Sequence, residues 1–584
     1  MMRTPRLGPL VMRVIGTGAI GLALAACGAS PPSEPPARPP NIVLVMTDDQ
    51  GWAQLGMRGD PYLRTPHLDR LASESVEFRR FYASPVCAPT RASLMTGRDA
   101  YRTGVTDTWL GRALMAPDEV TIAEGLGDAG YRTGIFGKWH LGDSHPMRAQ
   151  DQGFQEVLVH RGGGIGQPSD PPGSDYTDPI LFHNGEQRQF EGYVTDVLFT
   201  EAMRFIDARD GQPFFAYIAT NAPHSPYLVP DSYREPYAAL GLSDRDARIY
   251  GMITNIDDNM GRLIAFLDER GLRDDTILVF MTDNGPTTER FTAGLRNRKG
   301  STYEGGIRVP FFLRWPGVVP PRRLDIIAAH IDVMPTFLDA AGVALPPDTR
   351  VDGRSLLPLM RGGTDVEWPA RTIHIQAHRG NAPQPFRNAA VLTDRYKLVE
   401  GTGFAQPPAA DGQPELYDIT TDPGEEHDLA STLPDEVARL RRTYDAWLSD
   451  VSATRGFDPQ PIALGAEAEP SVTLSRQDWR VQGPDGWGAA HLGVWEVDVR
   501  TSGTYDVRVD LPPTSAFESP ARVTGGRLLL RLGDEIVRRD VAPGAEHVQV
   551  DGVAWPAGRA TLDARVTTPD GRDHGVWFVH VTRR

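Results

Sequence analysis

The sequence predicts an α/β fold with a mixed, mainly parallel sheet between helices, followed by a small α+β C-terminal subdomain and an all-β sandwich. Four apolar, strand-like segments indicate the sheet, because near-continuous apolar strands are those buried on both faces between helices. A segment with apolar residues at helical spacing, from 253 to 267, separates two of them. After about residue 460, apolar and charged residues alternate, which predicts short strands of a sandwich.

The four apolar segments place chemistry-bearing side chains at one edge of the predicted sheet. Two polar or charged residues follow each segment within a few positions. Asp48 and Asp49 follow segment 41–46, and Lys138 and His140 follow segment 133–136. Asn221 and His224 follow segment 214–219, and Asp283 and Asn284 follow segment 276–281. Ligands of open α/β sheets bind beyond the carboxyl ends of the strands, so we expect these side chains to share one site. The glycine-rich run 162–166 lacks the strand–helix context of a dinucleotide-binding loop and is expected to form a mobile loop at the rim of that site.

The length of 584 residues predicts two or more domains. The sheet and its helices predict a main domain over 41–324, and strand-like and helical segments predict an α+β subdomain over 325–460. The sandwich is expected over 461–584. Five tryptophans in it could include a sugar-stacking platform, or they could lie in the core, as aromatic residues at strand positions usually do: Trp479, Trp487, Trp495, Trp555 and Trp577.

The first 40 residues predict export. Arginines precede an apolar stretch at 14–26, which is the pattern of a secretory signal peptide over residues 1–27. Residues 24–27 resemble a bacterial lipobox, in which Cys27 becomes the lipidated N-terminus; the alternative is an ordinary signal peptide. The proline-rich segment 28–40 predicts an extended linker. We therefore expect a protein of the bacterial periplasm or cell surface, anchored by lipid in the outer membrane.

The net charge of -16 disfavours binding to polyanions such as nucleic acid. An acidic chain is a poor match for nucleic acid, so no nucleic-acid partner is expected. The same charge disfavours long-range attraction of a polyanion. An anionic substrate would therefore need a local cationic pocket.

The acidic residues after two of the strands predict a metal site. Asp48, Asp49, Asp283 and Asn284 offer only hard oxygen ligands, which suit Ca²⁺ or Mg²⁺. Helix capping is the alternative for each residue alone, since Asp and Asn are common caps. Two such clusters, both following buried strands, favour the metal.

Cys87 lies at the predicted start of a short helix. Pro89 suits its first turn and Gly97 suits its end. A helix N-terminus carries free N–H groups and the positive end of the dipole, so it favours an anion beside Cys87. The alternative for a lone cysteine is an inert buried thiol.

The segment that starts at Cys87, Cys-Ala-Pro-Thr-Arg, resembles the sulfatase motif Cys-x-Pro-Ser/Thr-Arg. Residues 137–142, Gly-Lys-Trp-His-Leu-Gly, and 299–310, which begin Lys-Gly-Ser-Thr-Tyr-Glu, match further motifs of that family. Over roughly 40–450 the chain resembles the type I, formylglycine-dependent sulfatases of the alkaline phosphatase superfamily and arylsulfatase-like bacterial lipoproteins. The resemblance implies an alkaline-phosphatase-like sulfatase fold, with the catalytic domain over 41–324.

The resemblance also implies the site and its maturation. A formylglycine-generating or sulfatase-maturating enzyme would oxidise Cys87 to formylglycine (3-oxoalanine). Ca²⁺ would bind the residue-87 oxygen together with Asp48, Asp49, Asp283 and Asn284. The implied catalytic residues are Cys87 as nucleophile, Arg91 and Lys138 as orienting cations, His140 as the base that helps to expel sulfate, and His224 or Lys299 as the acid for the leaving alcohol.

The sequence therefore predicts a sulfuric ester hydrolase that acts on a sulfated carbohydrate or an aryl sulfate. Export, the tether and the β domain favour a sulfated glycan. One alternative is a phosphonate or phosphodiester hydrolase of the same superfamily. Another is a surface glycan-binding protein without catalysis, which would require an unmodified Cys87.

Overall fold

A computed structural model describes residues 38–345, 349–362, 366, 368–404, 413–488, 491–512 and 525–584. The expected signal peptide, its lipobox with Cys27 and most of the 28–40 linker lie outside the described residues, so these expectations stay predictions. Within the described ranges, no helix is both long enough and apolar enough to cross a membrane.

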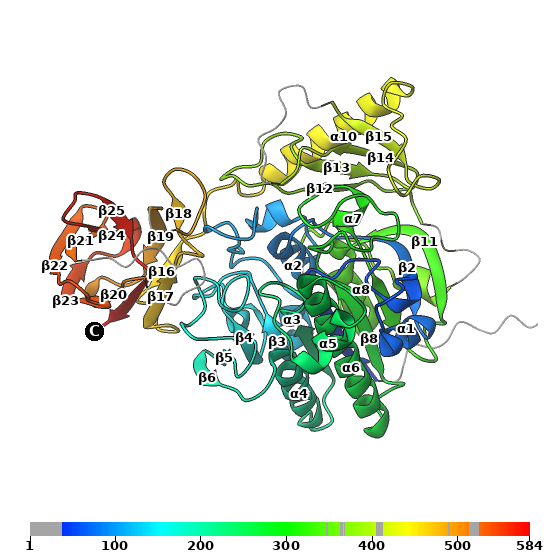
Figure 1. The fold of residues 1–584 in the computed structure, drawn as a ribbon, viewed down its shortest axis with the longest axis horizontal. Coiled ribbons are helices and arrows are strands. Elements are labelled where there is room, and N and C mark those ends of the chain that lie inside the picture. Colours follow the sequence, from blue (N-terminus) through cyan, green and yellow to red (C-terminus); the bar gives the residue numbers. More distant parts are fainter. Residues whose placement is uncertain are drawn as a thin grey trace, which may run out of the picture. The chain divides into compact units, whose positions relative to one another are not determined.

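An 11-stranded mixed sheet forms the centre of the main domain (Figure 1). Strand β1 (Asn41–Thr47) pairs in parallel with β7 (Phe214–Ala219) and β8 (Thr276–Thr282), and β3 (Arg132–Lys138) pairs in parallel with β7 and β4 (Glu156–His160). Strands β1, β3, β7 and β8 are the four predicted from the apolar segments, and β4 was not predicted. The other strands are β2 (Val76–Tyr82), β5 (Ile180–His183), β6 (Glu186–Gln189), β9 (Arg308–Val309), β10 (Phe311–Arg314) and β11 (Arg322–Ala329).

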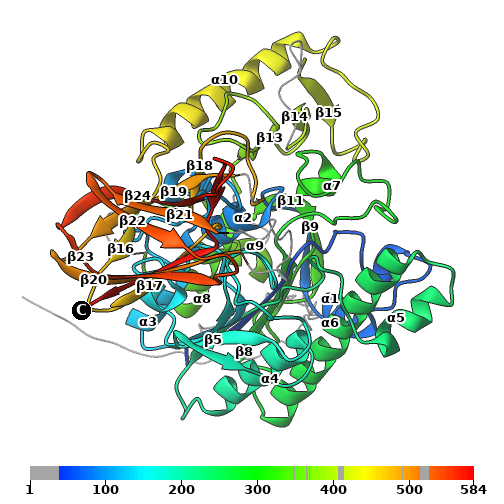
Figure 2. The same cartoon turned by 60° about the vertical axis from the view of Figure 1, so that its left-hand side comes forward.

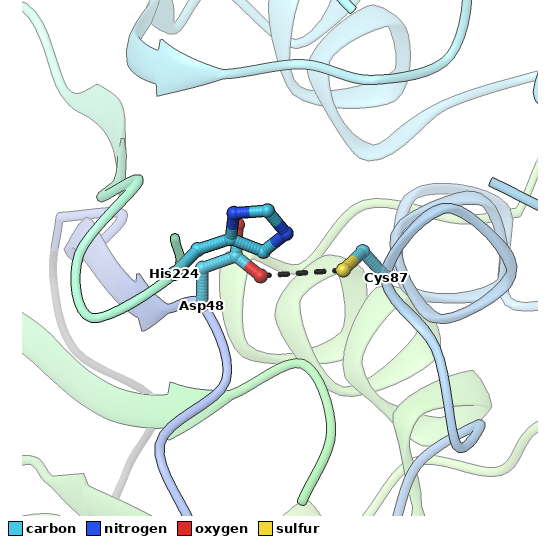
Figure 3. Close-up of side chains that lie close together, drawn as sticks. All are labelled: Asp48, Cys87 and His224. Carbon is cyan, nitrogen blue, oxygen red and sulfur yellow. Dashed lines mark hydrogen bonds between the residues drawn. The ribbon is translucent and has the colours of Figure 1, made fainter. Parts of the chain in front are cut away.

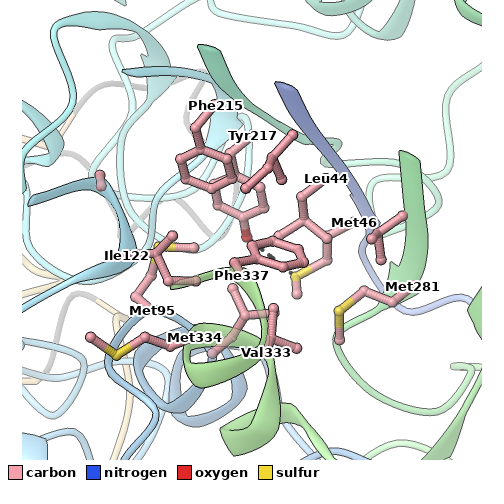
Figure 4. Close-up of a cluster of buried hydrophobic side chains, with 14 of the residues drawn as sticks. Leu44, Met46, Met95, Ile122, Phe215, Tyr217, Met281, Val333, Met334 and Phe337 are labelled. Atoms are coloured by element: carbon pink, nitrogen blue, oxygen red, sulfur yellow. Dashed lines mark hydrogen bonds between the residues drawn. The ribbon is translucent and has the colours of Figure 1, made fainter. Parts of the chain in front are cut away.

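Both faces of β1 are buried, which explains why its sequence is apolar without alternation. Ile42, Leu44 and Met46 pack into one core cluster, whereas Val43 and Val45 pack into a second. The first cluster includes side chains of α2 (Cys87–Thr96), α3 (Ile122–Asp128) and α8 (Val333–Ala341), and Figure 4 shows Leu44 and Met46 within it. The second includes side chains of α1 (Pro66–Ser73), α4 (Val194–Asp207) and α6 (Asp244–Glu269). Helices therefore cover both faces of the sheet.

Several shorter helices complete the main domain and its connection to the subdomain. The α-helices are α5 (Asp231–Ala238), α7 (Glu304–Ile307) and α9 (Leu357–Arg361). The 3-10 helices are η1 (Gly56–Arg58), η2 (Ala100–Thr103), η3 (Ala149–Gln152) and η4 (His330–Asp332).

A four-stranded antiparallel sheet and one long helix lie within the segment predicted as the subdomain. The predicted start at residue 325 was too early, because β11 pairs with β2 of the main sheet and α8 packs in the main core. The sheet runs in the order β12 (Ile373–Gln376), β13 (Ala389–Leu392), β14 (Tyr396–Glu400) and β15 (Glu415–Asp418). Helix α10 (Pro434–Ser452) packs Leu440 and Tyr444 against Leu398 and Leu416 of the sheet. The strand and helix segments predicted here lie within these elements.

The C-terminal part is a sandwich of two sheets, coloured orange to red in Figure 2. One sheet holds β16 (Ile462–Leu464), β18 (Arg480–Val481), β19 (Gly493–Val499), β21 (Gly526–Leu532), β22 (Glu535–Val541), β24 (Gly558–Thr567) and β25 (Asp573–Gly575). The other holds β17 (Ser471–Ser475), β20 (Gly503–Asp510), β23 (His547–Trp555) and β26 (Phe578–Arg583). The five tryptophans are at most 8% exposed, so they do not form an exposed stacking platform. Four of them lie in the hydrophobic core of the sandwich, as expected for aromatic residues at strand positions: Trp479, Trp487, Trp495 and Trp555.

Candidate active site

The carboxyl ends of β1, β3 and β8 bring the predicted site residues to one edge of the sheet. Asp48 and Asp49 follow β1, Asp283 follows β8, and Lys138 ends β3 with His140 two residues beyond. Asp49 and His140 have φ angles of 67° and 62°, a left-handed conformation that non-glycine residues seldom adopt. Such backbone outliers cluster at functional sites, where the surrounding structure holds the side chain in place.

Three buried carboxylates and one thiol form a compact set of potential ligands. The ligand atoms of Asp48, Asp49, Cys87 and Asp283 all lie within 4.8 Å of one another. Burial and the charge of Asp48 raise the pKa of Asp283 to about 7, because several negative charges share a space with little water. A cation between them would relieve this repulsion.

The orientation of Asn284 also fits a cation. Its Nδ2 donates to Asp49 Oδ1 at 2.8 Å and to the carbonyl of Gly285 at 2.9 Å. Its Oδ1 is buried and has no hydrogen-bond partner among the residues that the structure describes. A buried carbonyl-type oxygen without a donor is costly unless it binds something else. With three carboxylates nearby, this donor set suits Ca²⁺.

Cys87 is the first residue of α2 and its thiol faces the acidic cluster. Its Sγ donates to Asp48 Oδ1 at 3.2 Å (Figure 3), and Lys299 Nζ donates to Sγ at 3.5 Å. Val86 precedes the helix and has no side-chain acceptor for the free N–H groups of the first turn. Burial, followed by the charges of Asp283 and Asp48, raises the pKa of the Cys87 thiol well above its ordinary value. The unmodified residue is therefore a poor thiolate nucleophile.

Three cations pair with the three carboxylates. Arg91 donates to Asp283 Oδ2 through Nη2 at 2.8 Å and through Nε at 3.2 Å. Lys138 Nζ lies 2.5 Å from Asp48 Oδ2, and Lys299 Nζ lies 2.5 Å from Asp49 Oδ1. Burial would raise the pKa of Asp48, but the Lys138 ammonium outweighs it with the help of other cations and holds this pKa well below its ordinary value. Since the charges balance without a metal, a divalent cation would make the site net positive.

The two histidines lie beside the glycine-rich loop. His140 Nε2 is 2.7 Å from the carbonyl of Thr108, and His224 Nε2 is 3.8 Å from Asp49 Oδ2. Burial lowers the pKa of both rings, with Lys138 adding to the effect at His140 and Lys299 at His224. A Cβ on Gly163 would lie 2.9 Å from the His140 ring, so the loop predicted at the rim approaches closely here.

The structure thus brings together all the residues predicted for catalysis and metal binding. Their individual roles stay predictions. Two further residues at His140, Thr108 and Gln477, were not predicted. Gln477 Nε2 donates to the Thr108 carbonyl at 2.8 Å across a separation of 369 residues. No motif marks either residue, because one acts through its backbone and the other comes from a distant part of the chain.

The family model described as Sulfatase matches residues 40–343. The chain belongs to the sulfatase family. A second family model, described as "N-sulphoglucosamine sulphohydrolase, C-terminal", matches residues 297–448 of this sulfatase. Human arylsulfatase A is 31% identical over 491 residues, covering 74% of this chain and 92% of the relative. The N-acetylgalactosamine-6-sulfatase of Canis lupus familiaris is 34% identical over 382 residues, covering 60% and 70%.

Solved structures share the fold. The crystal structure of Ps i-CgsB in complex with k-i-k-neocarrahexaose superposes with a TM-score of 0.64 at 28% identity, covering 72% of this chain and 95% of that one. A structure with its substrate D-glucosamine-2-N,6-O-disulfate has a TM-score of 0.59 at 21% identity, covering 72% and 100%. The predicted sulfatase class and alkaline-phosphatase-like fold are confirmed, and the protein is a sulfatase enzyme.

Proposed function

We propose that this sulfatase hydrolyses sulfate esters with Ca²⁺ and with a formylglycine nucleophile made from Cys87. The observation that carries the proposal is the position of Cys87. It begins α2, lies within 4.8 Å of the ligand atoms of Asp48, Asp49 and Asp283, and contacts Lys299 at 3.5 Å. A helix N-terminus, a cation site and an ammonium therefore surround one modifiable side chain.

The charges of the site support an anionic ester as substrate. Asp48, Asp49, Asp283, Asn284 and the residue-87 oxygen would hold Ca²⁺, which supplies polarisation of the nucleophile and of the sulfate oxygens. Formylglycine would supply, as its hydrate, one hydroxyl that attacks sulfur after losing its proton to Asp283. Its second hydroxyl would lose a proton and re-form the aldehyde, which breaks the bond between carbon and the sulfate oxygen and releases sulfate. The cations Arg91, Lys138 and Lys299 keep the site positive when the metal is bound, which favours a sulfate monoester.

Proton transfer is assigned to Lys299, His224 and His140. Lys299 or His224 would protonate the departing alcohol. Burial opposes the ammonium of Lys299, but Asp49 and neighbouring anions outweigh this effect and raise the pKa of Lys299 well above its ordinary value. His140 would take the proton from the second hydroxyl. Its ring is suited to act as a base because burial and Lys138 keep it neutral.

The proposed substrate class is a sulfated carbohydrate. The enzyme itself is proposed to be exported and anchored by lipid. Two observations support it: similar proteins include N-acetylgalactosamine-6-sulfatases, and a similar solved structure contains k-i-k-neocarrahexaose. The predicted signal peptide and tether are consistent with a glycan outside the cytoplasm. A defined panel of sulfated sugars would show which linkage is cleaved.

The test compares wild-type protein with Cys87→Ala on aryl sulfate, phosphodiester and phosphonate esters. Peptide mass first establishes the conversion of Cys87 in the wild type. We expect sulfate ester hydrolysis to fall by roughly 10³-fold or more in Cys87→Ala, because the nucleophile is gone. Ser93→Ala, on the same helix, is the matched control and should keep its activity. Full activity in Cys87→Ala, or faster turnover of the phosphorus esters, would contradict the proposal.

A further inference from the structure

The C-terminal sandwich contacts a loop of the main domain, residues 108–112, that borders the active site. Leu110 of this loop is part of the hydrophobic core of the sandwich. Gly111 N donates to the carbonyl of Gln477 at 2.8 Å, and Arg112 makes two hydrogen bonds of 2.8 Å to Asp485. The loop is therefore anchored by apolar packing, by a backbone hydrogen bond and by an ion pair.

One residue of the sandwich, Gln477, also contacts the part of this loop that lies beside His140. Gln477 lies in the turn between β17 and β18 and is 3% exposed. Its Nε2 donates to the Thr108 carbonyl at 2.8 Å and lies 3.5 Å from His140 Nε2. The same carbonyl is 2.7 Å from His140 Nε2. The carbonyl of Thr108 is thus shared between Gln477 and His140.

The shared carbonyl decides which nitrogen of His140 carries the proton. A carbonyl can only accept, so Nε2 must hold the hydrogen and Nδ1 must present its lone pair. Nδ1 is buried, and within the described ranges no hydrogen-bond partner contacts it. The charged groups around the ring are Lys138 and Arg91, which disfavour a second proton, and Asp48, which favours one. The lone pair of Nδ1 is therefore not engaged by any hydrogen-bond donor of the described residues.

We propose that Gln477 of the C-terminal sandwich is a positioning residue for His140 and acts by fixing the Thr108 carbonyl. The sandwich is then part of the catalytic unit. The hydrogen bond from Gln477 opposes rotation of the peptide group that carries the Thr108 carbonyl. Because the carbonyl stays in place, the His140 ring keeps one tautomer and one orientation. Hydrogen-bond partners of this kind orient functional histidines. The inference rests on the proposed function, since it takes His140 as a base.

The kinetic test uses Gln477→Met, which keeps the volume of the side chain and removes its donor. We expect kcat to fall about tenfold, and KM to stay within about twofold, because the substrate contacts are unchanged. Gln549→Met, at an exposed position on β23 of the same sandwich, is the matched control and should behave as wild type. Conversion of Cys87 is measured by peptide mass in each protein.

Gln477→Glu provides a pH test with a definite sign. The carboxylate would lie near His140 Nε2 and favour the charged ring, so it would raise the pKa of His140 relative to wild type. A base works only when unprotonated, so the acidic limb of the kcat profile should move to higher pH. An unchanged limb would show that residue 477 does not act on His140.

Ring ¹⁵N shifts of His140 provide a readout without turnover, in full-length protein with Cys87 unconverted. His140→Asn assigns the signals. We expect Nε2-protonated imidazole in wild type and a second tautomer in Gln477→Met. Identical ring shifts in the two proteins overturn the proposal, even if kcat falls, because Gln477 would then have only a structural role. If converted wild-type protein does not hydrolyse sulfate esters, the proposed function fails, but these shifts still test the link between Gln477 and His140.

Discussion

At the scale of single residues, the acidic cluster and the free oxygen of Asn284 both indicate a bound cation. Because Ca²⁺ would bind only the folded chain, added Ca²⁺ should raise the melting temperature, by an amount that grows with the ratio of its concentration to Kd. We expect Asn284→Ala to weaken Ca²⁺ binding, since the amide oxygen is lost. Calorimetric titration and thermal unfolding with and without chelator measure both effects.

Asn284→Asp is the matched variant for this prediction. It keeps an oxygen at the same place, so it should retain more Ca²⁺ affinity than Asn284→Ala. Equal affinities in wild type and Asn284→Ala would contradict the assignment of Asn284 as a ligand.

Gly163 shows how closely backbone approaches the catalytic edge. An added Cβ would lie 2.9 Å from both Cε1 and Nε2 of His140. Gly163→Ala should therefore displace the ring and lower kcat, by up to roughly 10²-fold, because small misplacements of catalytic groups are costly. Gly127→Ala is the control, since a Cβ there meets only the Gly153 carbonyl at 4.0 Å. Equal activity of both variants would mean that the loop moves aside freely.

At the scale of elements, a buried ion-pair group joins the subdomain to the main domain. Lys397 of β14 lies 3.0 Å from Glu304 of α7 and 2.8 Å from Glu425, and all three side chains are buried. Lys397→Met should lower the free energy of unfolding by about 3–5 kcal/mol, because it removes the buried cation that Glu425 and Glu304 share and leaves Glu304 with the more distant Arg308, at 3.5 Å. Urea denaturation measures the change. Arg527→Met, which removes an exposed pair with Asp540, should cost less than about 1 kcal/mol.

The same group makes stability depend on pH. Burial, with the repulsion of Glu304, outweighs Lys397 and raises the pKa of Glu425 to about 7. The folded chain therefore holds this proton at pH values where the unfolded chain has released it, so stability falls as pH rises from about 4.5 to 7. Glu425→Gln should remove a part of that fall, on the order of 1–3 kcal/mol. Equal slopes for wild type and variant between pH 5 and pH 7 would contradict the raised pKa.

At the scale of the whole molecule, residues 38–584 form one compact unit because two predicted domains share a core. Leu110, Leu114 and Met147 of the main domain pack with the interior of the sandwich. We expect Leu110→Ala to lower the free energy of unfolding by about 2–5 kcal/mol. The loss of activity and the change in tryptophan fluorescence should follow the same denaturation curve, because the two domains unfold together. Leu240→Ala, at a position that is 50% exposed, is the control and should change stability little.

Much of the fold and of the site follows from local patterns in the sequence. The apolar run before Asp48 predicts a strand buried on both faces, and its carboxyl end must then meet those of its parallel neighbours. The same argument places Asp283 and Lys138 at that edge before any contact is known. The positions of Cys87 and Pro89 predict a helix start, which the structure has at Cys87.

Other features were decided only by the tertiary structure. The orientation of Asn284 Oδ1, the burial of the sandwich tryptophans and the shared Thr108 carbonyl have no local signature. A periodic pattern reports which face of an element is buried, but not which distant segment covers it. The contact of Gln477 with Thr108 depends on a backbone atom that every residue possesses, so only the folded chain shows that the sandwich reaches the catalytic histidine.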